Sequence, residues 1–410
     1  MSSTVETANE LRPFQVDIPE EELAELRRRV AAVRLPSREL VADRSQGVQL
    51  ATIQELARYW ATEHDWRKAE AKLNALPQFT TEIDGVEIHF IHVKSPHADA
   101  LPLIMTHGWP GSVIELLGTV GPLTDPTAHG GRAEAAFYLV LPSLPGYGFS
   151  GEPAEVGRDP GRVARAWAEL MGRLGYGRYV AQGGDVGASV TDAMGRQAPE
   201  GLVGIHMNLL VTVLAMPSLP TESEQERAAA DALATFRASG FGYFLEQATR
   251  PQTIGYALLD SPVALAAWLL DHDTDSYQKI SRAFVDGQPT GHLTRDTIVD
   301  NITLYWLTGT GRRRPGRTGR ADEPQLLRPA RRLLRSRFRS ASPPSPARSG
   351  GLRAVGSSGG IPTSPTSTRS TRAATSPPGK SPSCSPTKSE RPSGHCANRG
   401  AGGRRAWNRC

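Results

Sequence analysis

Residues 183–187 read Gly-Gly-Asp-Val-Gly, which places a carboxylate at the tip of a glycine turn. The apolar run Tyr179–Gln182 before it is typical of a short buried strand, and residues 188–194 after it are typical of a helix start. Strand, sharp turn and helix form a nucleophile elbow, in which Asp185 could attack carbon and leave an ester on the enzyme. Asp185 could equally cap the following helix. The pentapeptide alone leaves both interpretations open.

A second loop could serve the same chemistry. It comprises His107, Gly108, Trp109, Pro110, Gly111 and Ser112, and it follows the apolar run 101–106. Such a loop can give one backbone N–H to an oxyanion hole, and the residue after the nucleophile, Val186, can give the other. Alone, the loop could be a buried turn. Its place about 75 residues before an elbow carrying an aspartate favours the catalytic interpretation.

The elements that must position these loops alternate between strands and helices. Strands are expected at residues 79–83 and 86–93, joined by the hairpin signal Asp84-Gly85, and then at 101–106, 136–142, 179–182 and 202–207. This pattern predicts an α/β fold with a mostly parallel sheet, helices on both faces and an active site at the carboxyl ends of the strands. The predicted divisions are a helical arm (1–80), a sheet core (81–212), a helical cap (213–310) and a tail (311–410).

The tail differs in composition from the rest of the chain. Residues 311–410 hold 22 Lys and Arg against 3 Asp and Glu, whereas residues 1–310 hold 25 against 39. All three cysteines lie in the tail and all nine tyrosines lie before it, so no disulfide framework is expected in the first part. The tail is rich in Arg, Ser, Pro and Gly, and this composition predicts disorder.

Several other functions are not favoured by the sequence. The N-terminus lacks the features of a signal peptide, and no apolar stretch is long enough for a membrane span, so a cytoplasmic location is expected. His89 and His92 are expected on opposite faces of one strand and make a poor metal pair. His272 and His292 are expected to be isolated surface residues. Tyr305 and Trp306, at helical spacing among apolar residues, are expected in the core.

Taken in order, the motifs of the chain resemble those of epoxide hydrolases of the microsomal type, a branch of the α/β-hydrolase superfamily. The resemblance covers about residue 12 to Thr310. It is carried by the helical segment 12–78, the loop 107–110, the sequence Leu-Pro-Gly-Tyr-Gly-Phe-Ser at 144–150, the elbow 182–187, and the cap segments 239–243, 250–253 and 259–262. The resemblance implies an α/β-hydrolase sheet with a helical cap and a helical N-terminal arm.

The resemblance also implies a mechanism. Asp185 attacks an epoxide carbon while a cap tyrosine, Tyr243 by its spacing to Arg250-Pro251, donates a hydrogen bond to the ring oxygen. Tyr243 could alternatively be an ordinary core aromatic. A histidine oriented by an acid then activates water to hydrolyse the ester, and the N–H groups of Trp109 and Val186 stabilise the oxyanion. His107, Gly108, Pro110 and Gly184 are the predicted supporting residues.

The predicted histidine and acid should follow residue 310, where the resemblance stops. One explanation of the basic tail is nucleic-acid binding. The preferred explanation is translation in a shifted reading frame, because one shift permits family-like segments in the right order. It would place the acid at Arg348 and the histidine at Thr375. His395, the tail's one histidine, lies in low-complexity sequence.

The sequence therefore predicts an epoxide hydrolase that opens an epoxide with water to a vicinal diol, impaired by loss of its C-terminal histidine and acid. A haloalkane dehalogenase also carries an aspartate elbow, but the Trp109 loop and the arm argue against it. The alternative from another class is a non-catalytic, degenerate hydrolase whose tail binds nucleic acid or anionic surfaces. No metal or cofactor is expected, and the expected partners are an epoxide and water.

Overall fold

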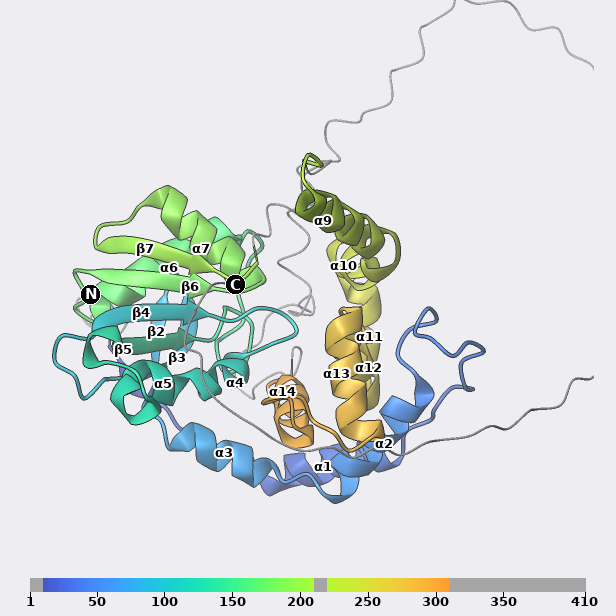
Figure 1. The fold of residues 1–410 in the computed structure, drawn as a ribbon. Coiled ribbons are helices and arrows are strands. Elements are labelled where there is room, and N and C mark those ends of the chain that lie inside the picture. The colour runs from blue at the N-terminus through green and yellow to red at the C-terminus, as the bar shows by residue number, and fades with distance from the viewer. Residues whose placement is uncertain (1–9, 210–219, 310–410) are drawn as a thin grey trace, which may run out of the picture. The chain divides into compact units, whose positions relative to one another are not determined.

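The computed structural model describes residues 10–209 and 220–309. Within these residues, a seven-stranded sheet has the order β1-β2-β3-β5-β4-β6-β7 (Figure 1). Its strands are β1 (Arg12–Pro13), β2 (Gln78–Ile83), β3 (Val86–Val93), β4 (Leu101–Thr106), β5 (Phe137–Pro142), β6 (Tyr179–Gly183) and β7 (Leu202–Met207). The predicted basic tail at 311–410, with the histidine and acid positions assigned to it, lies outside the described residues.

The sheet is mixed, so the prediction of a mostly parallel sheet is only half right. Strands β5, β4, β6 and β7 run parallel, whereas β1, β2 and β3 are joined to one another and to β5 by antiparallel pairing. The reason is the predicted hairpin. Asp84 and Gly85 both have positive φ, 53° and 72°, which suits the tight two-residue turns that reverse a strand.

Helices alternate with the parallel strands and then form a separate group, as the sequence predicts. They are α1 (Glu20–Ala31), α2 (Leu50–Thr62), α3 (Trp66–Asn74), α4 (Val113–Leu116), α5 (Val120–Thr124), α6 (Pro160–Arg173), α7 (Val186–Gln197), α9 (Glu224–Thr235), α10 (Gly242–Thr249), α11 (Pro251–Asp260), α12 (Pro262–Leu270), α13 (Thr274–Val285) and α14 (Arg295–Leu307). Within the described ranges, none of them is both long and apolar enough to cross a bilayer.

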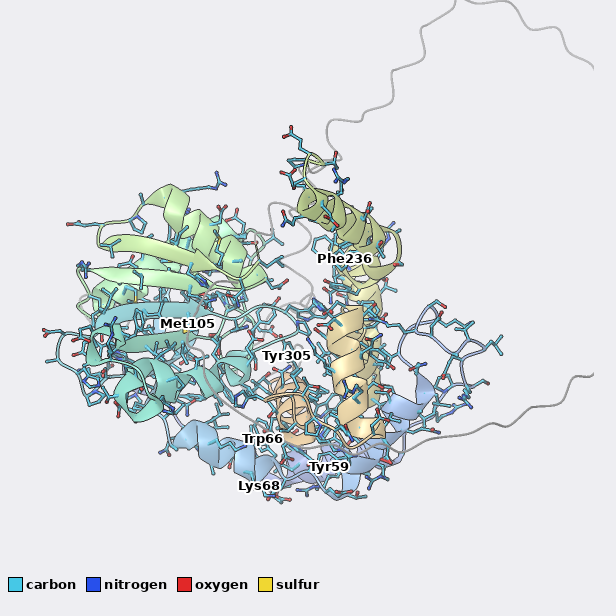
Figure 2. All side chains as sticks on the ribbon, in the orientation of Figure 1. Tyr59, Trp66, Lys68, Met105, Phe236 and Tyr305 are labelled. Carbon is cyan, nitrogen blue, oxygen red and sulfur yellow. The ribbon has the colours of Figure 1, made fainter. Side chains whose placement is uncertain are left out.

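Alternation along the central strands divides the core between the two faces of the sheet. Ile104 of β4 and Val140 of β5 pack in one apolar cluster with Trp167 of α6 and Val190 of α7. Their strand neighbour Met105 belongs to the other cluster, which also includes side chains of α3 and α4 (Figure 2). Side chains at successive positions of a strand point to opposite faces, so helices can cover both faces.

The predicted arm contacts both the sheet and the cap. Its strand β1 pairs with β2 at one edge of the sheet. On the cap side, the Thr52 hydroxyl of α2 lies 3.0 Å from the Tyr277 hydroxyl of α13, and His64 Nε2 lies 2.7 Å from Asp300 Oδ1 of α14. At the opposite edge, β7 leaves Val203 and Ile205 exposed by 52% and 41%.

Candidate active site

Asp185 stands between the end of β6 and the first residue of α7, as the elbow motif predicts. Its backbone has φ 52° and ψ −118°, a conformation that is strained for a residue with a side chain. The flanking glycines are needed because the chain is crowded here. A Cβ on Gly183 would lie 2.1 Å from the Gly187 carbonyl oxygen, and one on Gly187 would lie 2.0 Å from that of Thr106.

The side chain of Asp185 does not cap α7, which removes the alternative interpretation of this residue. Instead, its Oδ1 accepts a hydrogen bond from the backbone N–H of Trp109 at 3.0 Å. The Gly108 backbone lies so close to Asp185 that only glycine fits at position 108, because a Cβ there would lie 2.5 Å from the Asp185 Cβ. The two predicted loops therefore meet, and a backbone donor points at the candidate nucleophile.

Val186 and Gly184 flank Asp185 in different ways. Val186 is the first residue of α7, and the first N–H groups of a helix have no partner within the helix. That N–H group therefore has no partner within α7, and it directly follows Asp185 in the chain. Gly184 is not crowded, since a Cβ there would lie 3.7 Å from Asn208 at the closest. No steric demand for glycine exists at this position.

His107 supports the loop from within. The Leu144 N–H donates to its Nε2 at 3.1 Å, so Nδ1 carries the proton and donates to the Gly108 carbonyl oxygen at 2.9 Å. Burial lowers the pKa of His107 to about 4, against the opposing effect of the Gly108 carbonyl. The ring is therefore neutral near pH 7 and acts as a structural bridge. Pro110 follows Trp109 through a cis peptide bond.

Tyr243, near the start of α10, lies over the same loop. Its ring stacks on Trp109 with centroids 5.0 Å apart and an interplanar angle of 20°. Burial raises the pKa of the Tyr243 hydroxyl, and the negative charge of Asp185 raises it further. The hydroxyl thus stays protonated and able to donate near the candidate nucleophile.

Helix α14 holds the carbonyl groups of the loop, a function that the sequence did not predict. Asn301 donates from Nδ2 to the Pro110 oxygen at 2.8 Å, and its Oδ1 accepts from the Ser112 hydroxyl at 2.7 Å. The Tyr305 hydroxyl donates to the Gly111 oxygen at 2.6 Å. Tyr305 is buried as predicted, but it is also a loop ligand. The adjacent polar residues Asp300 and Asn301 within the otherwise largely apolar run 298–307 were the available signal, because polar groups of a packed helix need partners.

The prediction that His272 is an isolated surface residue is wrong. Its ring centroid lies 5.2 Å from that of Tyr243 and 5.9 Å from that of Trp109. Nδ1 lies 2.8 Å from Asp273 Oδ2, while Asp273 Oδ1 caps α13 by accepting from the Ser276 N–H at 2.8 Å. The hydrogen bond with His272 lowers the pKa of Asp273. The adjacent pair His-Asp before a helix was the missed signal.

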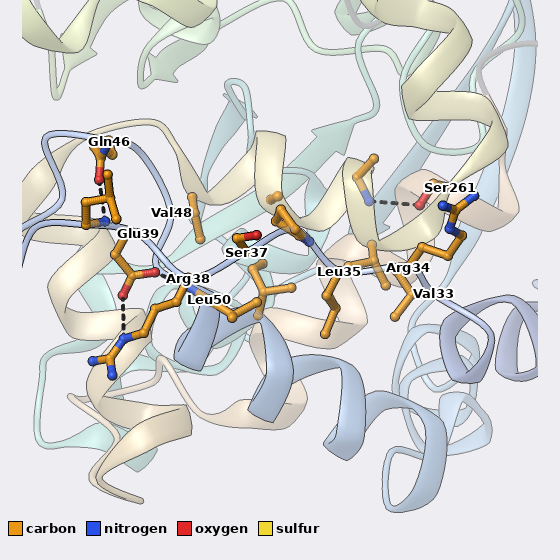
Figure 3. A pocket seen from close by; sticks show the side chains of 16 residues that line it. Val33, Arg34, Leu35, Ser37, Arg38, Glu39, Gln46, Val48, Leu50 and Ser261 are labelled. Carbon is orange, nitrogen blue, oxygen red and sulfur yellow. Dashed lines mark hydrogen bonds and ion pairs between the residues drawn. The ribbon is translucent and has the colours of Figure 1, made fainter.

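A surface cavity of about 480 Å³ lies between the segment 33–40, the start of α2 and α12, and it shares no residue with the elbow or its loop (Figure 3). In the parts of the chain that the structure describes, no group of three or more His, Cys, Asp or Glu side chains is placed to hold a metal ion.

The sheet, elbow and cap are those of an α/β-hydrolase, and solved structures agree. The chain is similar to Aspergillus niger epoxide hydrolase, with TM-score 0.64 and 32% identity over 80% of each chain. It is also similar to the juvenile hormone epoxide hydrolase of the silkworm Bombyx mori, with TM-score 0.61 and 28% identity over 82% of this chain and 77% of that one.

Sequence comparison identifies the family. A family model described as "Epoxide hydrolase N terminus" matches residues 11–116. A "Putative epoxide hydrolase" of Stigmatella aurantiaca is 52% identical over 303 residues, which cover 73% of this chain and 67% of that protein. "Epoxide hydrolase 1" of Oryctolagus cuniculus is 34% identical over 324 residues, covering 73% and 70%. The chain belongs to the epoxide hydrolase family, which confirms the resemblance drawn from its motifs.

Proposed function

We propose that this chain opens a small-molecule epoxide through an ester formed on Asp185, and that the product of hydrolysis is a vicinal diol. The contact that carries the proposal is the hydrogen bond from the Trp109 N–H to Asp185 Oδ1. It leaves the second carboxylate oxygen as the attacking atom. The membership of the chain in the epoxide hydrolase family supports the reaction type.

In the first step, an Asp185 oxygen forms a bond to an epoxide carbon while that carbon's bond to the ring oxygen breaks. The ring oxygen gains negative charge and takes a proton from the Tyr243 hydroxyl, which stacking on Trp109 holds over the loop. The raised pKa of Tyr243 keeps this proton in place until the charge develops. The product of this step is an alkyl ester of Asp185.

In the second step, water attacks the ester carbonyl. The N–H groups of Trp109 and Val186 are the proposed donors to the resulting oxyanion, because one already contacts Oδ1 and the other begins α7 beside it. The step needs a base, and the family's histidine and acid are expected in the region 311–410. We propose that the shifted reading frame removes them, so that the ester forms faster than it is hydrolysed.

The test is to mix the full chain with an aryl epoxide and to follow both intact mass and diol. We expect one epoxide mass on the peptide containing Asp185, with little diol. Asp185→Asn should give no adduct. Asp192→Asn, which changes an α7 aspartate paired with Arg196, should behave as the wild type and serves as the matched control.

Other outcomes discriminate between the two functions. No adduct and no diol from the wild type would contradict the proposal. The same result together with salt-sensitive DNA binding would favour the degenerate hydrolase whose basic tail binds nucleic acid. Rapid diol formation would contradict the loss of the hydrolytic residues but support the nucleophile. Sequencing the gene around the codons for residues 308–314 tests the shifted frame directly.

A further inference from the structure

Glu115 lies at the start of α4, and its side chain is turned towards the loop 107–112. Ser112 caps the helix by accepting from the Ile114 N–H at 3.2 Å, and Glu115 follows three positions later. In this pattern the glutamate ordinarily reaches back to the N–H of the capping residue. Glu115 Oε1 instead accepts from the Gly108 N–H at 3.3 Å. The carboxyl group thus binds the residue immediately before Trp109.

The loop is shaped to accommodate this carboxyl group. A Cβ on Gly111 would lie 1.7 Å from Glu115 Oε2 and 2.4 Å from its Cδ, so any side chain there would displace the group. Gly108 on the other side of the carboxyl contacts Asp185 itself. Glu115 therefore lies within the curve of the loop, one residue away from the donor to Asp185.

The surroundings of Glu115 couple its charge to Asp185. Burial raises the pKa of Glu115 to about 7, the Gly108 N–H opposes this, and the negative charge of Asp185 raises it further. The other titratable groups near Glu115 stay neutral around pH 7. The pKa of Tyr305 on α14 is raised well above 10, and that of His107 is lowered to about 4.

We propose that Glu115 is a positioning residue for the nucleophile: it holds the Gly108 N–H so that the Trp109 N–H points at Asp185, and its charge sets the reactivity of that carboxylate. This inference rests on the proposed function. Two carboxylates close together repel, and the charge on Asp185 disappears when the ester forms. The ionised form of Glu115 therefore favours alkylation, so the alkylation rate rises as the pH rises through about 7.

The experiment measures the rate of adduct formation on the full chain from about pH 5.5 to about 8.5. In the wild type we expect an increase of about fivefold across this range. Glu115→Gln can accept the same N–H but carries no charge, so it should keep the low-pH rate of the wild type at every pH. Glu115→Ala loses the contact as well and should be about tenfold slower throughout.

The chain offers a matched control in Glu226, which occupies the same position relative to a serine cap at the start of α9. Glu226 makes the ordinary contact, since its Oε2 accepts from the Ser223 N–H at 2.9 Å. Glu226→Gln should alkylate with the rate and pH dependence of the wild type. An infrared band of a protonated carboxyl group that disappears above pH 7, and is missing from Glu115→Gln, would support the assignment without any epoxide.

Each remaining outcome contradicts a specific part of the proposal for Glu115. If Glu115→Gln keeps the wild-type increase with pH, the charge of Glu115 does not act on Asp185. If Glu115→Ala alkylates at the wild-type rate, Glu115 does not position the loop. If the wild type forms neither adduct nor diol, the proposed function fails and this inference fails with it, whereas the first two results leave the proposed function standing.

Discussion

The candidate site has two sides that are built differently. The sheet side, residues 106–115 and 183–187, is fixed by backbone atoms: the Trp109 N–H contacts Asp185, and a Cβ on Gly187 would collide with the Thr106 carbonyl. The cap side comprises Tyr243, His272 and Asp273, which meet the sheet side through ring contacts. Backbone contacts leave little room for adjustment, whereas stacked rings can shift. The proposed nucleophile is therefore held rigidly, whereas the proposed substrate contacts of the cap can adjust.

The largest effect is expected from Gly187→Ala on the sheet side. The new Cβ would lie 2.0 Å from a backbone oxygen, which no rotamer change relieves, so we expect a loss of about 3 kcal/mol in the free energy of unfolding. Urea denaturation measures it. Gly172→Ala in α6, where a Cβ meets nothing within 4 Å, is the control and should be neutral or stabilising. Equal urea midpoints for Gly187→Ala and Gly172→Ala would contradict the conclusion that backbone contacts fix the sheet side rigidly.

On the cap side, Tyr243→Phe should change the rate and not the stability. Removing the hydroxyl leaves the stacking on Trp109 but removes the proton donor, so alkylation of Asp185 should slow by about 100-fold. Tyr256→Phe, on an exposed cap tyrosine of α11, should match the wild type. Adduct formation followed by mass spectrometry provides the rates. An unchanged rate in Tyr243→Phe would mean that another group donates the proton.

Acid should destabilise the fold through buried histidines of β3 and of the loop on the sheet side. Burial lowers the pKa of His89 to about 3 and the pKa values of His92 and His107 to about 4, so the unfolded chain binds more protons than the folded chain below pH 6.5. Stability is then full above pH 6.5 and falls as the pH drops towards 4. Glu115 acts oppositely between pH 4.5 and 7, because its folded pKa is raised. Three protons against one leave a net loss of about 2 kcal/mol per pH unit, because the partly exposed His92 contributes less than the other two histidines.

Urea midpoints measured from pH 7 to pH 4.5 check this dependence. His89→Gln should lower stability at pH 7, because the ring bonds Ser143 and Gln78, but it should flatten the slope. His292→Asn, on an exposed histidine, should leave the slope unchanged. A wild-type midpoint that rises on acidification would contradict the burial of neutral histidines.

The smallest expected effects come from replacing two helix-capping aspartates, one on each side of the site. Asp159 caps α6 near the sheet and Asp273 caps α13 in the cap, so replacing either by Ala should cost about 1 kcal/mol. Only Asp273→Ala should also slow alkylation, by about threefold, since it frees His272 beside Tyr243. Thermal unfolding and adduct rates measure both. If Asp159→Ala also slows alkylation, the slower rate of Asp273→Ala would be explained by the loss of folding stability alone.

The sequence predicted elements well where one local rule decides. The hairpin at Asp84-Gly85 and the strand 202–207 follow from turn residues and an apolar run, and the structure confirms them. It predicted the meeting of the elbow and the Trp109 loop from their shared place at the carboxyl ends of the strands, and the family resemblance supported that prediction. It missed Glu115, Asn301 and His272, because their partners lie across a loop or on another element, and the local signals at Asn301 and His272 do not identify those partners.

The contacts between arm and cap have a consequence for synthesis on the ribosome. His64 of the arm bonds Asp300 of α14, and the two residues are 236 positions apart. At ~5–20 residues per second, the arm waits roughly ten to fifty seconds for that partner to be made. During this interval the faces of α1 and α2 that later meet the cap have no intramolecular cover. We therefore expect a nascent chain of this protein to expose these helix faces until its last described helix emerges.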